Sequence, residues 1–515
     1  MPGMRQRGKM KRALLSVYDK TGVVEFAKEL VKNGFGIVST SGTAKLLQEN
    51  GVKIKTIEEI TKAPEVLGGR VKTLQHLIFA GILADKNNQE HLKEVEKFGF
   101  EPFDVVAVSL YPFSETIRKD GCTIPEAVEQ IDIGGVSLIR AAAKNYSSVS
   151  VLTSPSQYKD FTESLSVLNP DFNLQLAARA FAYIADYDID IANYFNKISC
   201  TGSSKFVVEY NSVQDLRYGE NPHQKSVLFN LAPKGFDDIF EKLHGKELSY
   251  INILDIDAAY NLINEFDEPS CAILKHTNPS GTASADNIKE AYIKAFSTDT
   301  VSPFGGIVIL NGNLDLATAE EIDKIFTEII IAAGYDKDAF EFLLKKKNRR
   351  LIKYHRQSKS SVQEIKSVTG GLLLQETDGI VVNENELKVV TERKPTPEEM
   401  KDMLFAMKVC KHTKSNAVIY AKNSQTIGIG GGQPSRVDSS MLAVNKAKRF
   451  GFDLTGCSVA SDAFFPFPDG VIEAAKAGAK SVIHPGGSVR DGEVIAAANE
   501  YGLAMVLTGV RHFKH

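Results

Sequence analysis

The sequence predicts an α/β protein that begins with a parallel-sheet domain and continues into two further α/β lobes. Three observations lead to this prediction. Short apolar runs alternate with helical patterns near the amino terminus, an order that is typical of parallel sheets. The motif Lys-His-Thr follows an apolar stretch twice, at 275–277 and at 411–413. A chain of 515 residues is also too long for one core, which favours three or four lobes.

The first elements can be placed by their patterns. We expect strands at 13–17, 35–39 and 103–111. Between the first two, apolar residues from Val23 to Val31 follow helical spacing, and Gly34 ends that helix. A polar turn at 40–43 precedes a short helix that ends at Gly51. Ligands of parallel sheets bind at the carboxyl ends of the strands, so this turn is either a phosphate site at a helix start or an ordinary connection.

Two segments between these strands carry charged residues in apolar surroundings. Arg70 and Lys72 alternate with Val71, so they can share one side of an extended segment, which is either part of a site or a solvated edge strand. Asp132 lies between two Ile residues, just before two Gly residues and a helix that ends at Lys144. Because a buried carboxylate needs a partner, Asp132 is either a structural cap or part of a ligand site.

The second part of the chain has its own candidate. Residues 271–274 predict a strand that ends at Lys275 and His276, beside a turn at Asn278 and Pro279. Such a pair is either catalytic or structural, and the repeat at 411–412 favours the catalytic reading. The polar stretch near 205 predicts a domain boundary, and the polar segment 345–370 predicts a break between two lobes. A second pair of similar strings, at 302–308 and 465–471, supports the two lobes.

Composition and missing motifs exclude several classes. Sixty-one Lys and Arg residues against 64 Asp and Glu give a net charge of −3, which argues against a dedicated nucleic-acid binder. The five cysteines are odd in number and widely spaced, so they predict neither disulfides nor zinc. No signal peptide or membrane-spanning run is expected, and we predict a soluble cytoplasmic protein. The Gly-rich segments fit neither dinucleotide nor Walker patterns, and the zinc-deaminase pattern is missing.

Taken together, the motifs resemble the family of bifunctional purine-biosynthesis proteins that combine AICAR formyltransferase with IMP cyclohydrolase, where AICAR is phosphoribosylaminoimidazolecarboxamide. The resemblance covers nearly the whole chain in order. The strings that carry it are SVYDKTG (16–22), GGRVKTL (68–74), LYPF (110–113), EQIDIGG (129–135), RAAAKN (140–145), LRYGENPHQ (216–224), KHTNPSG (275–281), GIGGGQPSR (428–436), SDAFFPF (461–467), GGSVRDGEV (486–494) and GVRHFKH (509–515).

The resemblance implies a methylglyoxal-synthase-like cyclohydrolase domain at 1–205. It implies a formyltransferase domain at 206–515, made of two cytidine-deaminase-like lobes without zinc. The two activities would be the last two steps of de novo purine biosynthesis. The formyl donor would be 10-formyltetrahydrofolate, with no catalytic metal and with room for a structural monovalent cation. The resemblance also implies a homodimer that binds small nucleotide and folate substrates, and neither nucleic acid nor membrane.

Site residues follow from the same resemblance. For formyl transfer, His276 would be the general base for the weakly nucleophilic amine, Lys275 would stabilise charge and Asn416 would hold the formyl carbonyl. For ring closure, the matching residues are Lys72, Tyr111, Asp132 and Lys144. The residues that match substrate-binding positions are Ser16, Lys20, Thr40, Gly42, Thr43, Arg70 and Thr73 in the first domain, and Arg217, Tyr218, Asn252, Arg436, Arg511 and Phe513 in the second.

The chain departs from the family's usual pattern at a few positions, chiefly in the cyclohydrolase half: Ser41, Gln75, Phe79 and Tyr146. Two alternatives follow from this. One is a working formyltransferase beside a degenerate cyclohydrolase, and the other is a non-catalytic nucleotide-binding protein that keeps the fold. Retention of the candidate catalytic residues argues against the second alternative.

Overall fold

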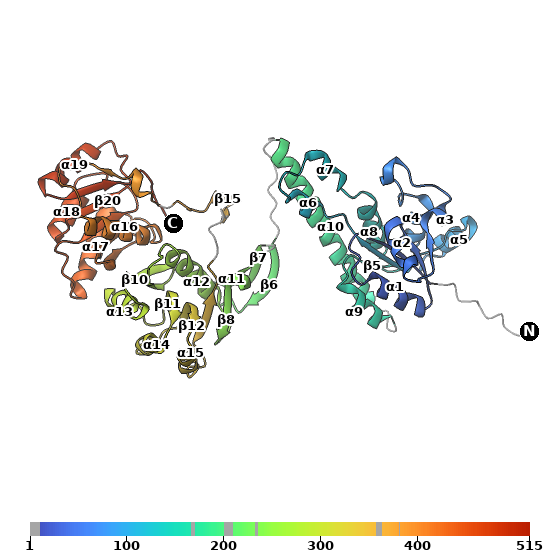
Figure 1. Ribbon diagram of the computed structural model, residues 1–515, viewed down its shortest axis with the longest axis horizontal. Coiled ribbons are helices and arrows are strands. Elements are labelled where there is room, and N and C mark those ends of the chain that lie inside the picture. The colour runs from blue at the N-terminus through green and yellow to red at the C-terminus, as the bar shows by residue number, and fades with distance from the viewer. Residues whose placement is uncertain (1–10, 166–169, 200–209, 232–234, 357–362, 381) are drawn as a thin grey trace, which may run out of the picture. The chain divides into compact units, whose positions relative to one another are not determined.

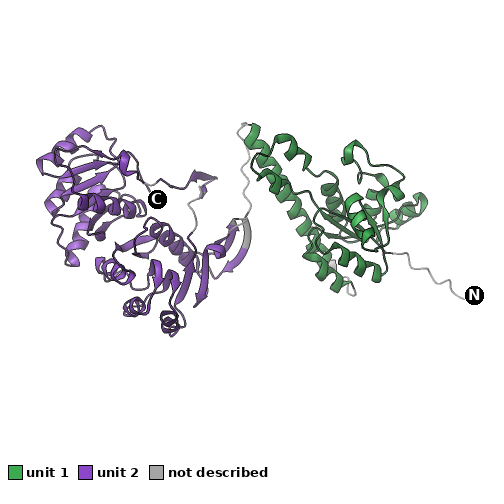
Figure 2. Cartoon of the chain, viewed as in Figure 1, with its two compact units in different colours: residues 1–209 green, residues 210–515 purple. Residues whose placement is uncertain are grey.

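The computed structural model describes residues 11–165, 170–199, 210–231, 235–356, 363–380 and 382–515. The chain divides into two compact units, residues 1–209 and 210–515 (Figure 2). The predicted boundary near residue 205 lies outside the described residues. Each unit has its own sheets and its own buried apolar clusters, one in the first unit and three in the second among the described residues.

The first unit, drawn in blue to green in Figure 1, contains a sheet of five parallel strands in the order β3–β2–β1–β4–β5. The strands are β1 (Lys11–Val17), β2 (Phe35–Ser39), β3 (Ile54–Thr56), β4 (Val105–Ser109) and β5 (Ser150–Leu152). The strands predicted at 13–17, 35–39 and 103–111 are β1, β2 and β4. Because the order of strands reverses between β1 and β4, the carboxyl ends of these two strands form the switch point at which such sheets bind ligands.

Helices cover this sheet in two groups. Helix α1 contacts α2 and α9, whereas α8 contacts α4 and α10. Strand β1 is apolar on both faces because helices bury it from both sides. The helices are α1 (Val23–Lys32), α2 (Ser41–Glu49), α3 (Ile57–Thr61), α4 (His76–Leu83), α5 (Gln89–Phe98), α6 (Phe113–Ile117), α7 (Ile124–Glu129), α8 (Gly134–Lys144), α9 (Gln157–Ser164) and α10 (Pro170–Ser199).

Two local expectations differ from the structure. The predicted turn at 40–43 is already helical from Ser41, so the polar residues form the first turn of α2. The segment 68–74 is not a strand; a short 3-10 turn, Leu67–Gly69, stands at its start. Gly68 and Gly69 have φ angles of 64° and 95°. These left-handed conformations suit glycine and break an extended chain.

The second unit is built on one mixed sheet of twelve strands, in the order β16–β21–β20–β19–β17–β18–β10–β9–β11–β12–β13–β8. Its strands are β8 (Phe240–His244), β9 (Ser270–Lys275), β10 (Asn278–Ser284), β11 (Ile307–Leu314), β12 (Ile329–Tyr335), β13 (Arg350–Tyr354), β16 (Lys388–Val389), β17 (Val418–Lys422), β18 (Gln425–Gly430), β19 (Ser458–Ser461), β20 (Ser481–His484) and β21 (Ala504–Leu507). Two separate hairpins accompany it, β6 (Tyr210–Leu216) with β7 (Ser226–Leu231), and β14 (Gln363–Val368) with β15 (Gly371–Glu376).

Helices α12 and α16 share one core that includes strands of both lobes, whereas α13 and α17 each belong to a separate core. The helices of this unit are α11 (Phe236–Ile239), α12 (Tyr250–Ile263), α13 (Ile288–Thr298), α14 (Leu316–Asp323), α15 (Lys337–Leu343), α16 (Pro397–Lys411), α17 (Arg436–Arg449), α18 (Asp469–Ala477) and α19 (Asp491–Glu500). The shared core makes the two lobes one folded body.

The lobes join where β10 pairs with β18, at Ala283 and Gln425. Two buried threonines reinforce this seam. The Thr282 N–H donates to the Thr426 Oγ1 at 2.9 Å, and that hydroxyl donates to the Thr282 carbonyl at 3.1 Å. The Ser284 N–H also donates to the Ser424 carbonyl at 2.9 Å. The sheet is therefore continuous from one lobe to the other.

The predicted internal repeat is present, but in a different register. Each lobe runs helix, hairpin, and then three helix–strand pairs, from α12 to β13 and from α16 to β21. Lys275 ends strand β9, whereas Lys411 ends helix α16. The strings 302–308 and 465–471 also do not correspond, because the first leads into a strand and the second into a helix. The hairpin residues equivalent to 275–277 are 422–424.

Candidate active sites

A first cluster of polar side chains lies at the carboxyl ends of β1 and β2. The Thr40 Oγ1 donates to the Ser16 Oγ at 2.9 Å, and the Lys20 Nζ donates to the Thr43 Oγ1 at 2.9 Å. Gly42 has open space where a side chain would project. The structure thus brings these predicted binding residues together at the start of α2, where helix N–H groups favour anions. Burial lowers the pKa of Lys20, Asp19 opposes that shift, and the positive charge of Lys72 adds to it.

Asp132 and its neighbours continue this cluster beyond β4. The Gly135 N–H donates to the Asp132 Oδ1 at 2.6 Å, and the Asp132 N–H donates to the Tyr187 hydroxyl at 2.8 Å. Burial raises the pKa of Asp132, while hydrogen bonds from the main chain of Gly135 and Tyr111 and the charge of Lys72 oppose that rise. Asp132 therefore caps α8, and it also lies within electrostatic reach of Lys72 and next to the main chain of Tyr111.

The two glycines after Asp132 are required by close packing. A Cβ atom on Gly135 would lie 2.6 Å from the Asp132 Oδ2. A Cβ atom on Gly134 would collide with the Thr73 Oγ1. The glycines thus let the main chain approach Asp132 and Thr73, both of which are predicted site residues.

The basic residues of 68–74 are paired with carboxylates. Arg70 forms an ion pair with Glu129, and the Lys72 Nζ lies 4.0 Å from the Glu65 Oε1. The Ser41 Oγ donates to the other oxygen of Glu65 at 2.9 Å. Glu65 therefore connects the first turn of α2 with Lys72, a link that no feature of the sequence indicated.

Lys144 lies apart from this cluster. It is the last residue of α8 and is exposed, whereas Asp132 precedes the first residue of that helix. A helix of 11 residues spans about 16 Å at a rise of about 1.5 Å per residue. Within this unit the structure does not bring Lys144 together with Lys72, Tyr111 and Asp132.

A second cluster surrounds the turn between β9 and β10. The Lys275 Nζ donates to the Phe304 carbonyl at 2.9 Å, and the Thr277 N–H donates to the Asp255 Oδ1 at 2.6 Å. His276 is exposed. Burial raises the pKa of Asp255, the Thr277 N–H and the His276 charge oppose that rise, and Glu328 adds to it. The turn is therefore held from α12 and presents the His276 side chain to solvent.

Asn252 belongs to the same neighbourhood. It is buried on α12, and its Nδ2 donates to the Glu328 Oε1 at 3.2 Å. The Arg350 Nη1 lies 2.8 Å from that same oxygen. This predicted binding residue thus lies one helical turn before Asp255 and is fixed by a paired carboxylate.

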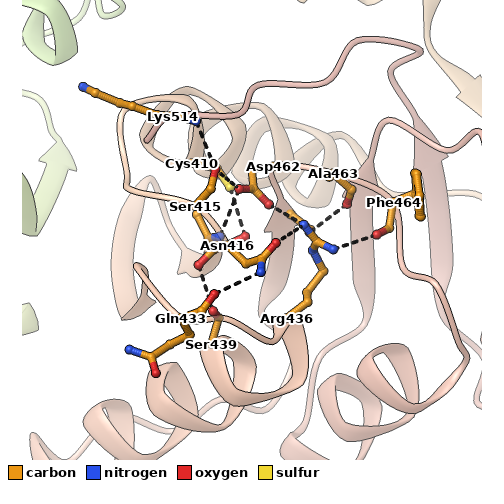
Figure 3. Close-up of polar contacts among 12 residues, drawn as sticks. Cys410, Ser415, Asn416, Gln433, Arg436, Ser439, Asp462, Ala463, Phe464 and Lys514 are labelled. Atoms are coloured by element: carbon orange, nitrogen blue, oxygen red, sulfur yellow. Dashed lines mark hydrogen bonds and ion pairs between the residues drawn. The ribbon is translucent and has the colours of Figure 1, made fainter. Parts of the chain in front are cut away.

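Asn416 and Arg436 form a partly buried network in the second lobe (Figure 3). The Asn416 Nδ2 donates to the carbonyls of Gln433 and Pro434 at 3.0 and 2.9 Å, and its Oδ1 accepts from the Arg436 Nη2 at 2.9 Å. The same Nη2 lies 2.8 Å from an oxygen of Asp462, which is fully buried. Both predicted residues are therefore held rigidly, and both amide donors of Asn416 are engaged within the protein.

The carboxyl-terminal segment closes this network. The Lys514 N–H donates to the Ser415 Oγ at 3.0 Å, and the His512 N–H donates to the Asp462 carbonyl at 3.0 Å. Arg511 and Phe513 are exposed on either side of His512. The Arg511 guanidinium carbon lies over the Phe513 ring, 4.5 Å from its centroid. These two predicted binding residues thus lie beside the segment that carries Asn416.

One contact joins the two parts of the second cluster. The Lys414 N–H donates to the Asn278 Oδ1 at 3.1 Å, so the turn of His276 and the segment of Asn416 are neighbours at the seam. Arg217 and Tyr218 lie elsewhere, in the loop after β6. The Arg217 guanidinium carbon lies over the Tyr218 ring, 4.9 Å from its centroid. Within the described residues, this pair forms no hydrogen bond or ion pair with His276 or Asn416.

The second Lys-His pair has a structural role. Lys411 and His412 are buried, and the Lys411 Nζ and the His412 Nε2 each lie 3.1 Å from the Glu265 Oε1. Burial lowers the pKa of His412 to about 4. The pair therefore ties the end of α16 to the end of α12, and the sequence-based suggestion that it echoes a catalytic pair is wrong.

Two residues that sequence reasoning missed organise the second cluster. Asp255 lies three positions after Asn252, which places both on one face of α12. Asp462 directly follows β19, a position at a strand end that often carries polar site residues. The three-residue spacing on α12 and the position directly after β19 are the two sequence signals that indicate these residues.

Comparison with known proteins assigns this architecture to a family. A model of the AICARFT/IMPCHase bienzyme matches residues 142–446, and a model of the MGS-like domain matches residues 22–137. The first match alone covers more than half of the chain. This chain belongs to the AICARFT/IMPCHase bienzyme family. It is therefore an enzyme of purine biosynthesis with two activities, AICAR formyltransferase and IMP cyclohydrolase, and its substrates are small molecules.

Relatives of full length agree with this membership. The bifunctional purine biosynthesis protein PurH of Chlorobium phaeobacteroides strain BS1 is 49% identical, over 98% of this chain and 99% of its own length. PurH of Persephonella marina is 48% identical, over 98% of this chain and 100% of its own length. Among solved structures, the crystal structure of ForH is 32% identical and covers 38% of this chain and 99% of that chain, with a TM-score of 0.34.

No group of three or more His, Cys, Asp or Glu side chains in the described ranges could hold a metal ion. None of the helices that the structure describes is long and apolar enough to span a membrane.

Proposed function

We propose that the first unit carries the IMP cyclohydrolase and that the second unit carries the AICAR formyltransferase. The observation that supports this division is the segregation of the two polar clusters. The residues assigned to ring closure lie in residues 1–209, and the residues assigned to formyl transfer lie in residues 210–515.

For formyl transfer, the donor is 10-formyltetrahydrofolate and the acceptor is the 5-amino group of AICAR. The amine nitrogen attacks the formyl carbon and passes a proton to His276, whose exposed position at the seam makes it accessible to a substrate. The folate nitrogen leaves with a proton as tetrahydrofolate. Lys275 supplies positive charge for the oxygen of the intermediate, and the Asn416 segment forms the opposite side of the site.

For ring closure, the carboxamide nitrogen attacks the formyl carbon, and the adduct then loses water. Asp132 accepts the proton of the attacking nitrogen, while Lys72 and Tyr111 stabilise and protonate the departing oxygen. The cluster at the start of α2 holds the nucleotide phosphate. We assign Lys144 no step, because it lies at the opposite end of α8.

The division predicts that the activities separate when the chain is cut near residue 205. A fragment 1–205 is expected to close formylated AICAR to IMP without folate, because its sheet and core are complete within the first unit. Ring closure is measured from the appearance of IMP. The full chain is the positive control, and the same fragment with Lys72→Ala is the negative control. A folded but inert fragment beside an active full chain would show that the division is wrong.

We also propose that the enzyme is a homodimer in the cytoplasm. The hairpin β14–β15 supports the dimer, because two-stranded hairpins are marginally stable alone. Its apolar side chains are 40–59% exposed in the single chain, as Ile365, Val368, Leu372, Leu373 and Leu374 show. Exposed apolar surface of this kind is typical of a protein interface.

Light scattering at the concentration of the activity assay is expected to give about twice 56.4 kDa. Replacing Leu372 and Leu374 with Ser should shift the mass toward one chain, because it removes apolar area from the hairpin. The control is a variant with Glu94→Gln and Glu96→Gln, two exposed positions of α5, and its mass should equal that of the unmodified enzyme. A fully active monomer of the unmodified chain would contradict the proposal.

A further inference from the structure

The two lobes hold their first hairpin turns in the same way. In the first lobe, the Lys275 Nζ donates to the Phe304 carbonyl, three residues before β11, at 2.9 Å. In the second lobe, the Lys422 Nζ donates to the Thr455 carbonyl, three residues before β19, at 2.7 Å. The turns that follow these lysines therefore occupy equivalent places in the repeat.

Both turns also share an unusual backbone. His276 and Thr277 have φ angles of 53° and 63°, and Asn423 and Ser424 have φ angles of 55° and 54°. Residues other than glycine rarely adopt this left-handed region, and they stay there only when their surroundings enforce it. Something outside the turn must therefore enforce this conformation in each lobe.

In each lobe a buried aspartate from the preceding helix performs this task. Asp255 accepts the Thr277 N–H at 2.6 Å, and the His276 N–H faces the same carboxylate. Asp402 accepts the N–H groups of Asn423 and Ser424 at 2.9 and 2.7 Å. Each aspartate lies in the second turn of its helix. A carboxylate suits this role because its two oxygens can accept from two donors at once.

We propose that Asp255 is a positioning residue for formyl transfer, because it fixes the main chain of the turn that carries His276. The inference rests on the proposed role of His276. The second lobe has the same device, but it carries Asn423 where the first lobe carries His276. Asp402 therefore holds a turn without a proton acceptor, and it provides a matched comparison within the same chain.

The test compares Asp255→Ala and Asp255→Asn with Asp402→Ala and Asp402→Asn in the full chain. Asp255→Ala is expected to lower kcat for formyl transfer on the order of 10–100-fold, because a small displacement of a reacting group has this effect. KM for AICAR is expected to stay within about twofold, since the Asp255 carboxylate bonds to the main chain of the turn, whereas Asn252, the predicted binding residue on the same helix, is held by Glu328. Asp255→Asn keeps one acceptor oxygen and should restore part of kcat. The Asp402 variants should lower Tm to a similar degree while kcat stays normal.

His276→Ala, measured in parallel, separates the possible failures. If His276→Ala is inactive and Asp255→Ala has normal kcat, Asp255 does not position His276, although the proposed function stands. If His276→Ala is active, the proposed function itself is wrong. Equal losses of kcat in the Asp255 and Asp402 variants would also overturn the inference, because they would reflect stability alone. If Asp255→Ala does not fold, Asp255→Asn decides: a normal kcat overturns the inference, and a lowered kcat with unchanged KM supports it.

Discussion

Replacing His276 with Ala is expected to lower the rate of formyl transfer by about 10²–10⁴-fold, the usual effect of removing a general base. Ring closure should be unchanged, because its residues lie in the first unit. The side chain of His276 is exposed, and the turn is held through main-chain N–H groups, so the fold should survive. The measurement supplies AICAR with 10-formyltetrahydrofolate and then, separately, preformed formylated AICAR to the same preparation.

Asn423→Ala is the matched control for this change, since it alters the equivalent position of the second lobe. It should leave both activities at the level of the unmodified enzyme. Nearly normal formyl transfer by His276→Ala would show that another group accepts the proton. If both activities fall together with Tm, His276→Gln, which keeps a polar side chain of similar length, takes its place in the comparison.

Asp132→Asn is expected to lower ring closure by about 10²–10⁴-fold and to leave formyl transfer intact. The amide oxygen of Asn can still accept from the Gly135 N–H, so the start of α8 is retained. Burial raises the pKa of Asp132, so its carboxylate is protonated at a higher pH than an ordinary Asp. Ring closure in the unmodified enzyme should therefore decline on the acid side above the usual Asp range, and the variant should lack this decline.

The pH profile of IMP formation from formylated AICAR checks this prediction. Asp160→Asn changes an exposed carboxylate of α9, and it should leave both the rate and the profile unchanged. A variant at Asp132 with the normal rate would exclude the carboxylate as the proton acceptor. If the rate of ring closure by Asp132→Asn still declines at low pH as in the unmodified enzyme, the decline reports the titration of a different group.

Much of the fold could be predicted because its signals are local. The strands β1, β2 and β4 are continuous apolar runs, since helices bury them, and α8 ends at Lys144 as expected. The register of the repeat could not be predicted in this way. Three identical letters, Lys-His-Thr, occur at a strand end and at a helix end, and only the tertiary structure distinguishes them. The equivalent turn at 422–424 shares only its lysine with the turn at 275–277.

The candidate sites show the same limit. Residues within one motif, such as Asp132 and Gly135, could be grouped from sequence because they are neighbours in the chain. Asp255 acts on Thr277 from a different element, and Glu65 links Ser41 with Lys72 through a turn that the sequence did not indicate. Contacts between distant segments depend on how the helices pack, and no local pattern records them.

The continuous sheet of the second unit restricts how this enzyme can move during turnover. Rotating one lobe away from the other would break the bonds between Thr282 and Thr426, both of which are fully buried. Each polar group left without a partner would cost about 1–3 kcal/mol, and the core shared by α12 and α16 would open as well. The two lobes therefore form one rigid body and do not open and close as separate domains about a hinge. The spacing between the His276 turn and the Asn416 segment, which the Lys414 N–H bridges by donating to Asn278, is therefore set when the chain folds and does not depend on closure of one lobe onto the other.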